Sequence, residues 1–227
     1  MVIAVRKHKI AYMALPKAAC SSVKAAIAQI DDEKRDDGGF TCDMKWHSMY
    51  PTRRFRPHRW NALGDDWYRF CVVRDPVQRL MSCYMNRVVV REDLVNCRNI
   101  RRGIVDLPSM PDPDFFFQNI KAYKQASSSI RHHTLPSWLF LGPDLTAYDD
   151  VFKIPELPKL AQKLQKRTGK IVRMERENAT AVREKLTLDD LQPKTRRSLR
   201  KFVAKEYVFL AGHFANPLET GTWRKAA

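Results

Sequence analysis

The chain lacks several features that would assign it to common protein classes. It has 8 glycines among 227 residues and none in residues 9–24, so the G-x-x-x-x-G-K-[ST] loop of ordinary ATPases and GTPases is absent from that segment. Its 5 cysteines form an odd set without a C-x-x-C pair, so we expect reduced thiols. No metal site is evident in the sequence, and we expect none.

Long apolar segments and linkers are also missing. No apolar run reaches the length of a membrane span, and residues 1–5 are too short an apolar run for a signal peptide. We therefore expect a cytoplasmic protein. No Gly/Ser-rich linker or internal repeat divides the sequence, which predicts a single domain over residues 1–227.

Basic residues outnumber acidic ones, 41 to 25, and the net charge is +16. This excess indicates anionic partners. Residues 53–60 interleave basic and aromatic side chains, so a nucleic-acid- or polyanion-binding module without catalysis is the alternative to an enzyme. No zinc-finger, zipper or RNA-recognition pattern accompanies this run, which makes nucleic acid the lesser hypothesis.

Residues 9–24 are typical of a buried strand that ends at Pro16 in a short loop and continues into a helix. The helix is supported by apolar residues that recur at helical spacing and would pack on a sheet: Val23, Ile27 and Ile30. The unpaired N–H groups and positive dipole end of such a helix attract an anion. The alternative is a simple strand-to-helix turn.

The residue types around this turn favour a phosphate-binding cradle. Lys17 and Lys24 supply positive charge, and we expect Ser21 or Ser22 to cap the helix and donate to the anion. Small residues, Ala18 and Ala19, occupy the positions where a nucleotide-binding loop would have glycine, and they still allow a fairly close approach to the backbone.

A second strand-to-helix segment follows the same plan. Residues 68–73 form an apolar run, Asp75 is a helix cap and Pro76 fits the first helical position. Arg74 would therefore stand at the carboxyl end of a strand, where open α/β sheets bind ligands, and Ser82 lies on the following helix. An arginine and a serine in these positions suit a second phosphate; the alternative is a solvated strand end and a helix-surface serine.

Other segments complete the coarse reading of the fold. Helical patterns cover residues 115–125, 156–167 with Gly169 at the end, and 193–211, and strand patterns cover residues 150–154 and 170–174. Alternation of strands and helices predicts an α/β fold with a mainly parallel sheet covered by helices.

Together, the motifs at residues 16–24 and 73–84 resemble the paired signatures of sulfotransferases that use 3′-phosphoadenosine 5′-phosphosulfate (PAPS). The resemblance is greatest to the carbohydrate-type sulfotransferase family 2, and it continues more faintly through residues 131–138, 148–157 and 199–214. Near the end of the chain the family pattern is altered at residues 205–209. The resemblance implies a P-loop NTPase-like three-layer sandwich and transfer of a sulfuryl group from PAPS to a hydroxyl of a carbohydrate or glycolipid.

The resemblance also implies roles for individual residues. Lys17 would contact the bridging oxygen and the transferring sulfuryl group, and Arg74 and Ser82 would bind the 3′-phosphate. Ser21 and Ser22 would bind the 5′-phosphate. The whole motif that would hold the 5′-phosphosulfate consists of Pro16, Lys17, Ala18, Ala19, Cys20, Ser21 and Ser22. A nucleophilic role for the Cys20 thiol is a minor alternative.

Transfer to a hydroxyl needs a base, and histidine is suited to this role near neutral pH. In enzymes of the resembled family the base is a His or Glu between the two motifs, which here offers His47 as first choice and His58 as second. His58 stands in a strongly basic run that also suits phosphate or acceptor contact. We expect His133 to line the acceptor or cofactor cleft.

Eukaryotic relatives in this family typically carry an N-terminal membrane anchor. The sequence begins without one, which favours a bacterial-type enzyme or a chain from which an anchor has been removed.

Overall fold

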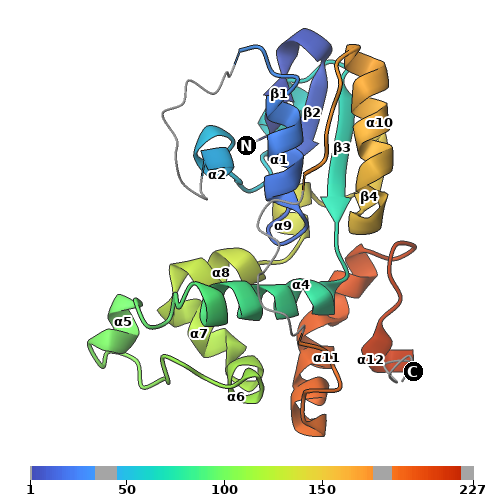
Figure 1. The fold of residues 1–227 in the computed structure, drawn as a ribbon. Coiled ribbons are helices and arrows are strands. Elements are labelled where there is room, and N and C mark those ends of the chain that lie inside the picture. The colour runs from blue at the N-terminus through green and yellow to red at the C-terminus, as the bar shows by residue number, and fades with distance from the viewer. Residues whose placement is uncertain (1, 34–44, 176–185, 221–227) are drawn as a thin grey trace. The chain divides into compact units, whose positions relative to one another are not determined.

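The central sheet is 4-stranded, with the order β1-β2-β3-β4, in the computed structural model, which describes residues 2–33, 45–175 and 186–220 (Figure 1). β1 pairs antiparallel with β2, and the β2–β3 and β3–β4 pairs are parallel. The prediction of an α/β fold with a mainly parallel sheet is confirmed. The strands are β1 (Ile3–Val5), β2 (Ile10–Met13), β3 (Tyr68–Val73) and β4 (Asp150–Lys153).

The chain divides into two units, Met1–Arg74 with Pro136–Ala179 and Asp75–Leu135 with Thr180–Ala227. The first contains the sheet, two 3-10 turns, η1 (Arg6–His8) and η3 (Ile154–Glu156), and the helices α1 (Cys20–Ala28), α2 (Lys45–Met49), α3 (Pro57–Asn61), α9 (Trp138–Leu141) and α10 (Leu157–Thr168).

The second unit is helical throughout its described part. In it a π-helix, η2 (Tyr84–Val90), directly continues α4. Its helices are α4 (Pro76–Cys83), α5 (Arg98–Arg101), α6 (Pro113–Gln118), α7 (Ile120–Ala126), α8 (Ser128–Thr134), α11 (Pro193–Phe209) and α12 (Pro217–Thr220).

Both faces of the sheet are buried. Large side chains on one face, including Tyr12 and Phe70, share a core with the apolar stripe of α1 and with Leu160 and Leu164 of α10. Side chains on the opposite face, such as Met13 and Cys71, are also buried. Strands that are buried on both faces have mostly apolar sequences. This explains why residues 68–73 do not alternate between apolar and polar side chains. The three-layer P-loop-like arrangement stays a prediction.

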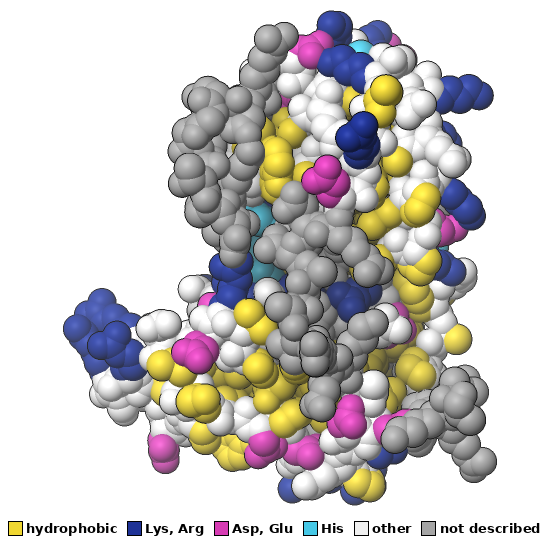
Figure 2. All heavy atoms as spheres, in the orientation of Figure 1, with side chains coloured by type: hydrophobic (Ala, Val, Ile, Leu, Met, Phe, Trp, Pro, Cys, Tyr) yellow, Lys and Arg dark blue, Asp and Glu magenta, His cyan; other side chains and the backbone are white. Residues whose placement is uncertain are grey.

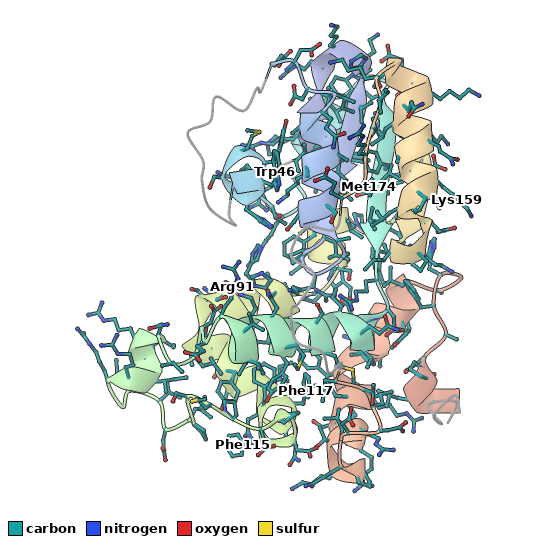
Figure 3. The ribbon with its side chains drawn as sticks, in the orientation of Figure 1. Trp46, Arg91, Phe115, Phe117, Lys159 and Met174 are labelled. Atoms are coloured by element: carbon teal, nitrogen blue, oxygen red, sulfur yellow. The ribbon has the colours of Figure 1, made fainter. Side chains whose placement is uncertain are left out.

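The second unit has its own aromatic core. The apolar stripe of α4 packs there with Phe116 and Phe117 of α6 and Tyr123 of α7 (Figure 3). The rings of Phe116 and Phe117 meet edge to face at 5.2 Å, an arrangement that aromatic pairs favour. This core holds α4, the helix within the second motif.

Helix boundaries follow the expected capping chemistry at several places. The Asp75 carboxylate accepts a hydrogen bond from the Gln78 N–H (2.9 Å), and Pro76 is the first residue of α4. Gly169 ends α10 in the left-handed conformation at φ 70°, which glycine adopts without steric cost. These predictions are confirmed.

Two predicted elements differ. The helix expected over residues 115–125 is split into α6 and α7, because the Asn119 side chain donates to the Phe115 carbonyl (2.9 Å) and Asn119 itself leaves helical geometry. The strand expected over residues 170–174 is not formed. There the Gln29 side chain bonds both backbone groups of Arg173, at 2.8 and 2.9 Å, in place of a neighbouring strand.

In the parts of the chain that the structure describes, no helix is long and apolar enough to cross a membrane. The cysteines within these parts are buried thiols, as expected, and Cys42 lies outside them.

Candidate phosphate-binding site

The predicted cradle is the turn between β2 and α1. Ala18 N–H donates to the Leu15 carbonyl (3.2 Å), and Lys17 and Ala19 adopt left-handed conformations with φ of 65° and 55°. This conformation costs a non-glycine residue about 1–2 kcal/mol. Strained residues of this kind concentrate at ligand-binding turns, where the surrounding structure holds them.

The helix cap differs from the expectation. Ala19, and not Ser21 or Ser22, is the residue that precedes α1, and it provides no side-chain cap. Ser21 and Ser22 lie inside the first turn, so neither serves as the cap. Ala19 thus offers no side-chain oxygen to the first-turn N–H groups of α1, and a helix start of this kind suits an anionic ligand.

Arg74 joins this turn from the neighbouring strand. β2 and β3 are parallel, with Met13 opposite Cys71, so the loops after both strands begin at the same edge of the sheet. The Arg74 guanidinium donates to the Lys17 carbonyl at 3.1 Å. The two predicted motif residues Lys17 and Arg74 are thus brought together, and the arginine also helps to hold the turn.

His47 also reaches the turn, from α2. Its Nε2 lies 2.9 Å from Ser21 Oγ, and its Nδ1 lies 3.0 Å from Lys24 Nζ. Trp46, the preceding residue, marks the position of α2 beside α1 in Figure 3. The structure therefore places the first-choice base next to a serine of the cradle.

Lys24 is the residue whose surroundings the sequence did not reveal. Its side chain is 0% exposed, and its ammonium donates to Thr52 Oγ1 at 2.6 Å. Burial lowers the pKa of Lys24 to about 8, and the nearby Cys20 thiol opposes this shift. Lys24 was expected to add charge to the cradle, but it lies beneath the cradle, against His47.

His58 is placed differently. It lies on α3 with an exposed side chain, and none of the hydrogen bonds found in the described residues joins it to the turn or to α1.

The second unit carries the other two predicted residues. Ser82 is half-buried on α4. His133 is half-buried near the end of α8, where its Nδ1 lies 2.9 Å from the Ser129 carbonyl oxygen one turn earlier. Their predicted roles stay predictions.

Two residues of the second motif have partners that sequence reasoning missed. Arg79 is 2% exposed and pairs with Glu206 of α11 at 3.4 Å. Asp75 accepts a hydrogen bond from the Tyr207 hydroxyl at 2.7 Å, and burial together with this carboxylate raises the pKa of Tyr207. The Glu206-Tyr207 sequence, which lies in the altered part of the family pattern, thus anchors α11 to the start of α4.

Within the described residues, no group of three or more His, Cys, Asp or Glu side chains is arranged to hold a metal ion.

A model described as the sulfotransferase family matches residues 1–211, so the chain belongs to the sulfotransferase family. This match confirms the resemblance to sulfotransferase family 2, and it spans both motifs, at residues 16–24 and 73–84. No curated protein and no solved structure gives a significant match.

Proposed function

We propose that this sulfotransferase uses PAPS as donor and transfers its sulfuryl group to a hydroxyl of a carbohydrate or glycolipid. The single observation that carries the proposal is the meeting of Lys17 and Arg74 at one edge of the sheet, beside an uncapped helix start. A PAPS donor has a 5′-phosphosulfate and a 3′-phosphate, and the two motifs offer a site for each. In this proposal residues 1–227 act as one sulfotransferase domain.

The cradle fits the phosphosulfate by its chemistry. First-turn N–H groups of α1 and the hydroxyls of Ser21 and Ser22 can donate to the 5′-phosphate oxygens. The full set that would hold this group is Pro16, Lys17, Ala18, Ala19, Cys20, Ser21 and Ser22. Lys17 places an ammonium where negative charge develops as the bond between sulfur and the leaving phosphate breaks.

The 3′-phosphate is assigned to Arg74 and Ser82. A guanidinium can bind phosphate through two parallel N–H bonds, and a hydroxyl adds a third donor. Arg74 uses one terminal nitrogen for the Lys17 carbonyl, so binding there would link the phosphate to the turn itself. His133 would line the acceptor or cofactor cleft.

His47 is the proposed base, because its ring lies at the cradle whereas His58 is exposed on α3. Sulfuryl transfer requires a group that accepts the acceptor hydroxyl proton as its oxygen bonds to sulfur. The reaction as proposed requires no metal. His58 stays as the second candidate or as a contact for an anionic acceptor.

The alternative, a binding module without catalysis, is favoured by the net charge of +16 and by the basic and aromatic run at residues 53–60. Among the described residues on the face shown in Figure 2, the Lys and Arg side chains are dispersed among acidic and apolar ones. A polyanion-binding module also has no need for a contact between a half-buried histidine and a buried lysine at a helix start.

The test is transfer of a labelled sulfuryl group from PAPS to a panel of hydroxylated glycans and glycolipids. The proposal is supported if wild type forms labelled product and Lys17→Ala forms none. Release of inorganic sulfate only, or equal labelling with wild type and Lys17→Ala, would count against it.

A further inference from the structure

The contact between Lys24 and His47 joins a buried lysine to a half-buried histidine. Lys24 Nζ lies 3.0 Å from His47 Nδ1 and 2.6 Å from Thr52 Oγ1. In the described parts of the chain no carboxylate forms an ion pair with this lysine. A buried ammonium without a carboxylate loses its proton more readily than an exposed one, in agreement with its lowered pKa of about 8.

The direction of the hydrogen bond to His47 depends on the charge of Lys24. An ammonium has only donors, so His47 Nδ1 must then accept, and a neutral ring carries its proton on Nε2. Nε2 in that state donates to Ser21 Oγ, 2.9 Å away. A neutral amine can instead accept from Nδ1–H, which leaves Nε2 with a lone pair that accepts a proton.

We propose that Lys24 is a positioning residue that selects which ring nitrogen of His47 carries the proton, and so whether Nε2 donates or accepts beside Ser21. The groups facing Lys24 are the Cys20 thiol of α1, His47 of α2 and the Thr52 hydroxyl. Thr52 does not titrate in this range, so the charge of Lys24 decides which of the two nitrogens donates in its contact with His47.

The catalytic meaning of this selection rests on the proposed function. The acceptor O–H proton passes to His47 Nε2, the acceptor oxygen bonds to sulfur, and the bond from sulfur to the leaving phosphate breaks with its electron pair remaining on the phosphate. Only the form with neutral Lys24 leaves Nε2 able to accept that proton. The transfer rate should therefore rise as pH increases through about 8.

Nitrogen NMR of isotope-labelled protein tests the proton position without any activity assay. The His47 ring signals are assigned by their loss in His47→Gln. In wild type we expect Nε2 to be protonated below about pH 8 and Nδ1 above it. In Lys24→Met, whose methionine side chain has a similar length and no titratable group, this change of the protonated nitrogen with pH should be absent. Protonation of the same nitrogen throughout in wild type, or the same change in Lys24→Met, would overturn the proposal.

Thr52→Val provides a second variant if Lys24→Met does not fold. Removal of the hydroxyl takes away a hydrogen-bond acceptor that stabilises the Lys24 ammonium, so the change of the protonated nitrogen should occur at lower pH. The same transition pH in Thr52→Val and wild type would contradict the contact between Lys24 and Thr52. The transfer rate measured against pH then separates the proposed function from the proposed role of Lys24. If wild type shows the change of protonated nitrogen but transfers no sulfuryl group, only the proposed function is wrong. If wild type transfers the group without that change, only the role of Lys24 is wrong.

Discussion

Replacement of Arg79 by methionine should strongly destabilise the protein although Arg79 belongs to a motif that we propose binds the cofactor. Its guanidinium is 2% exposed, pairs with Glu206 and donates to the carbonyls of His133 (3.2 Å) and Leu135 (2.9 Å). Loss of one partner of a buried ion pair costs about 3–5 kcal/mol. The two carbonyls also lose their donor, so we expect a loss at or above the upper end of that range.

Urea unfolding followed by circular dichroism measures this loss. Arg98→Met is the matched control, because Arg98 is exposed on α5 and its loss should change the unfolding free energy by less than about 0.5 kcal/mol. The double variant Arg79→Met/Glu206→Leu should lose less stability than Arg79→Met, because it also removes the buried carboxylate that Arg79→Met deprives of its cation. A loss below about 1 kcal/mol for Arg79→Met would refute the reasoning.

Four further substitutions test the site. Lys17→Ala should abolish transfer in a labelled-PAPS assay and leave much of the nucleotide affinity; wild-type turnover would remove its role. Arg74→Ala should weaken binding of PAPS and of 3′-phosphoadenosine 5′-phosphate (PAP) in calorimetry, because a charge-assisted phosphate contact is lost, and unchanged affinity would exclude it. His47→Ala should lower the rate with nucleotide binding intact, and if His58→Ala has this effect instead, our order of the two bases is wrong. Ala19→Gly should raise the unfolding free energy by about 0.5–1 kcal/mol, because relief of the left-handed strain exceeds the entropy cost of glycine; destabilisation in urea unfolding would contradict this account of the turn.

Local chemistry explains what the sequence predicted well. The apolar run at residues 68–73 is β3, and the Asp75-Pro76 pair sets the start of α4, because strand burial and helix capping depend on neighbouring residues. The two strand ends also lie at one edge, as parallel pairing requires, so Lys17 and Arg74 meet.

Contacts between distant parts of the chain explain what the sequence did not predict. Gln29 replaces a strand partner for Arg173 although 144 positions separate them. His47 was chosen because of its residue type, but its contact with Lys24 depends on the packing of α2 against α1. Ala19 precedes α1 because it adopts a left-handed conformation, which alanine does not favour and which the sequence therefore does not predict.

The central claim, that the two motifs bind PAPS, is tested most directly by calorimetric titration of the protein with PAP, with adenosine 5′-phosphate and ATP as controls and a repeat at higher salt. Our account predicts tight binding that requires the 3′-phosphate and persists at higher salt. Equal binding of all three nucleotides that disappears with salt would contradict it and would indicate a generic basic surface.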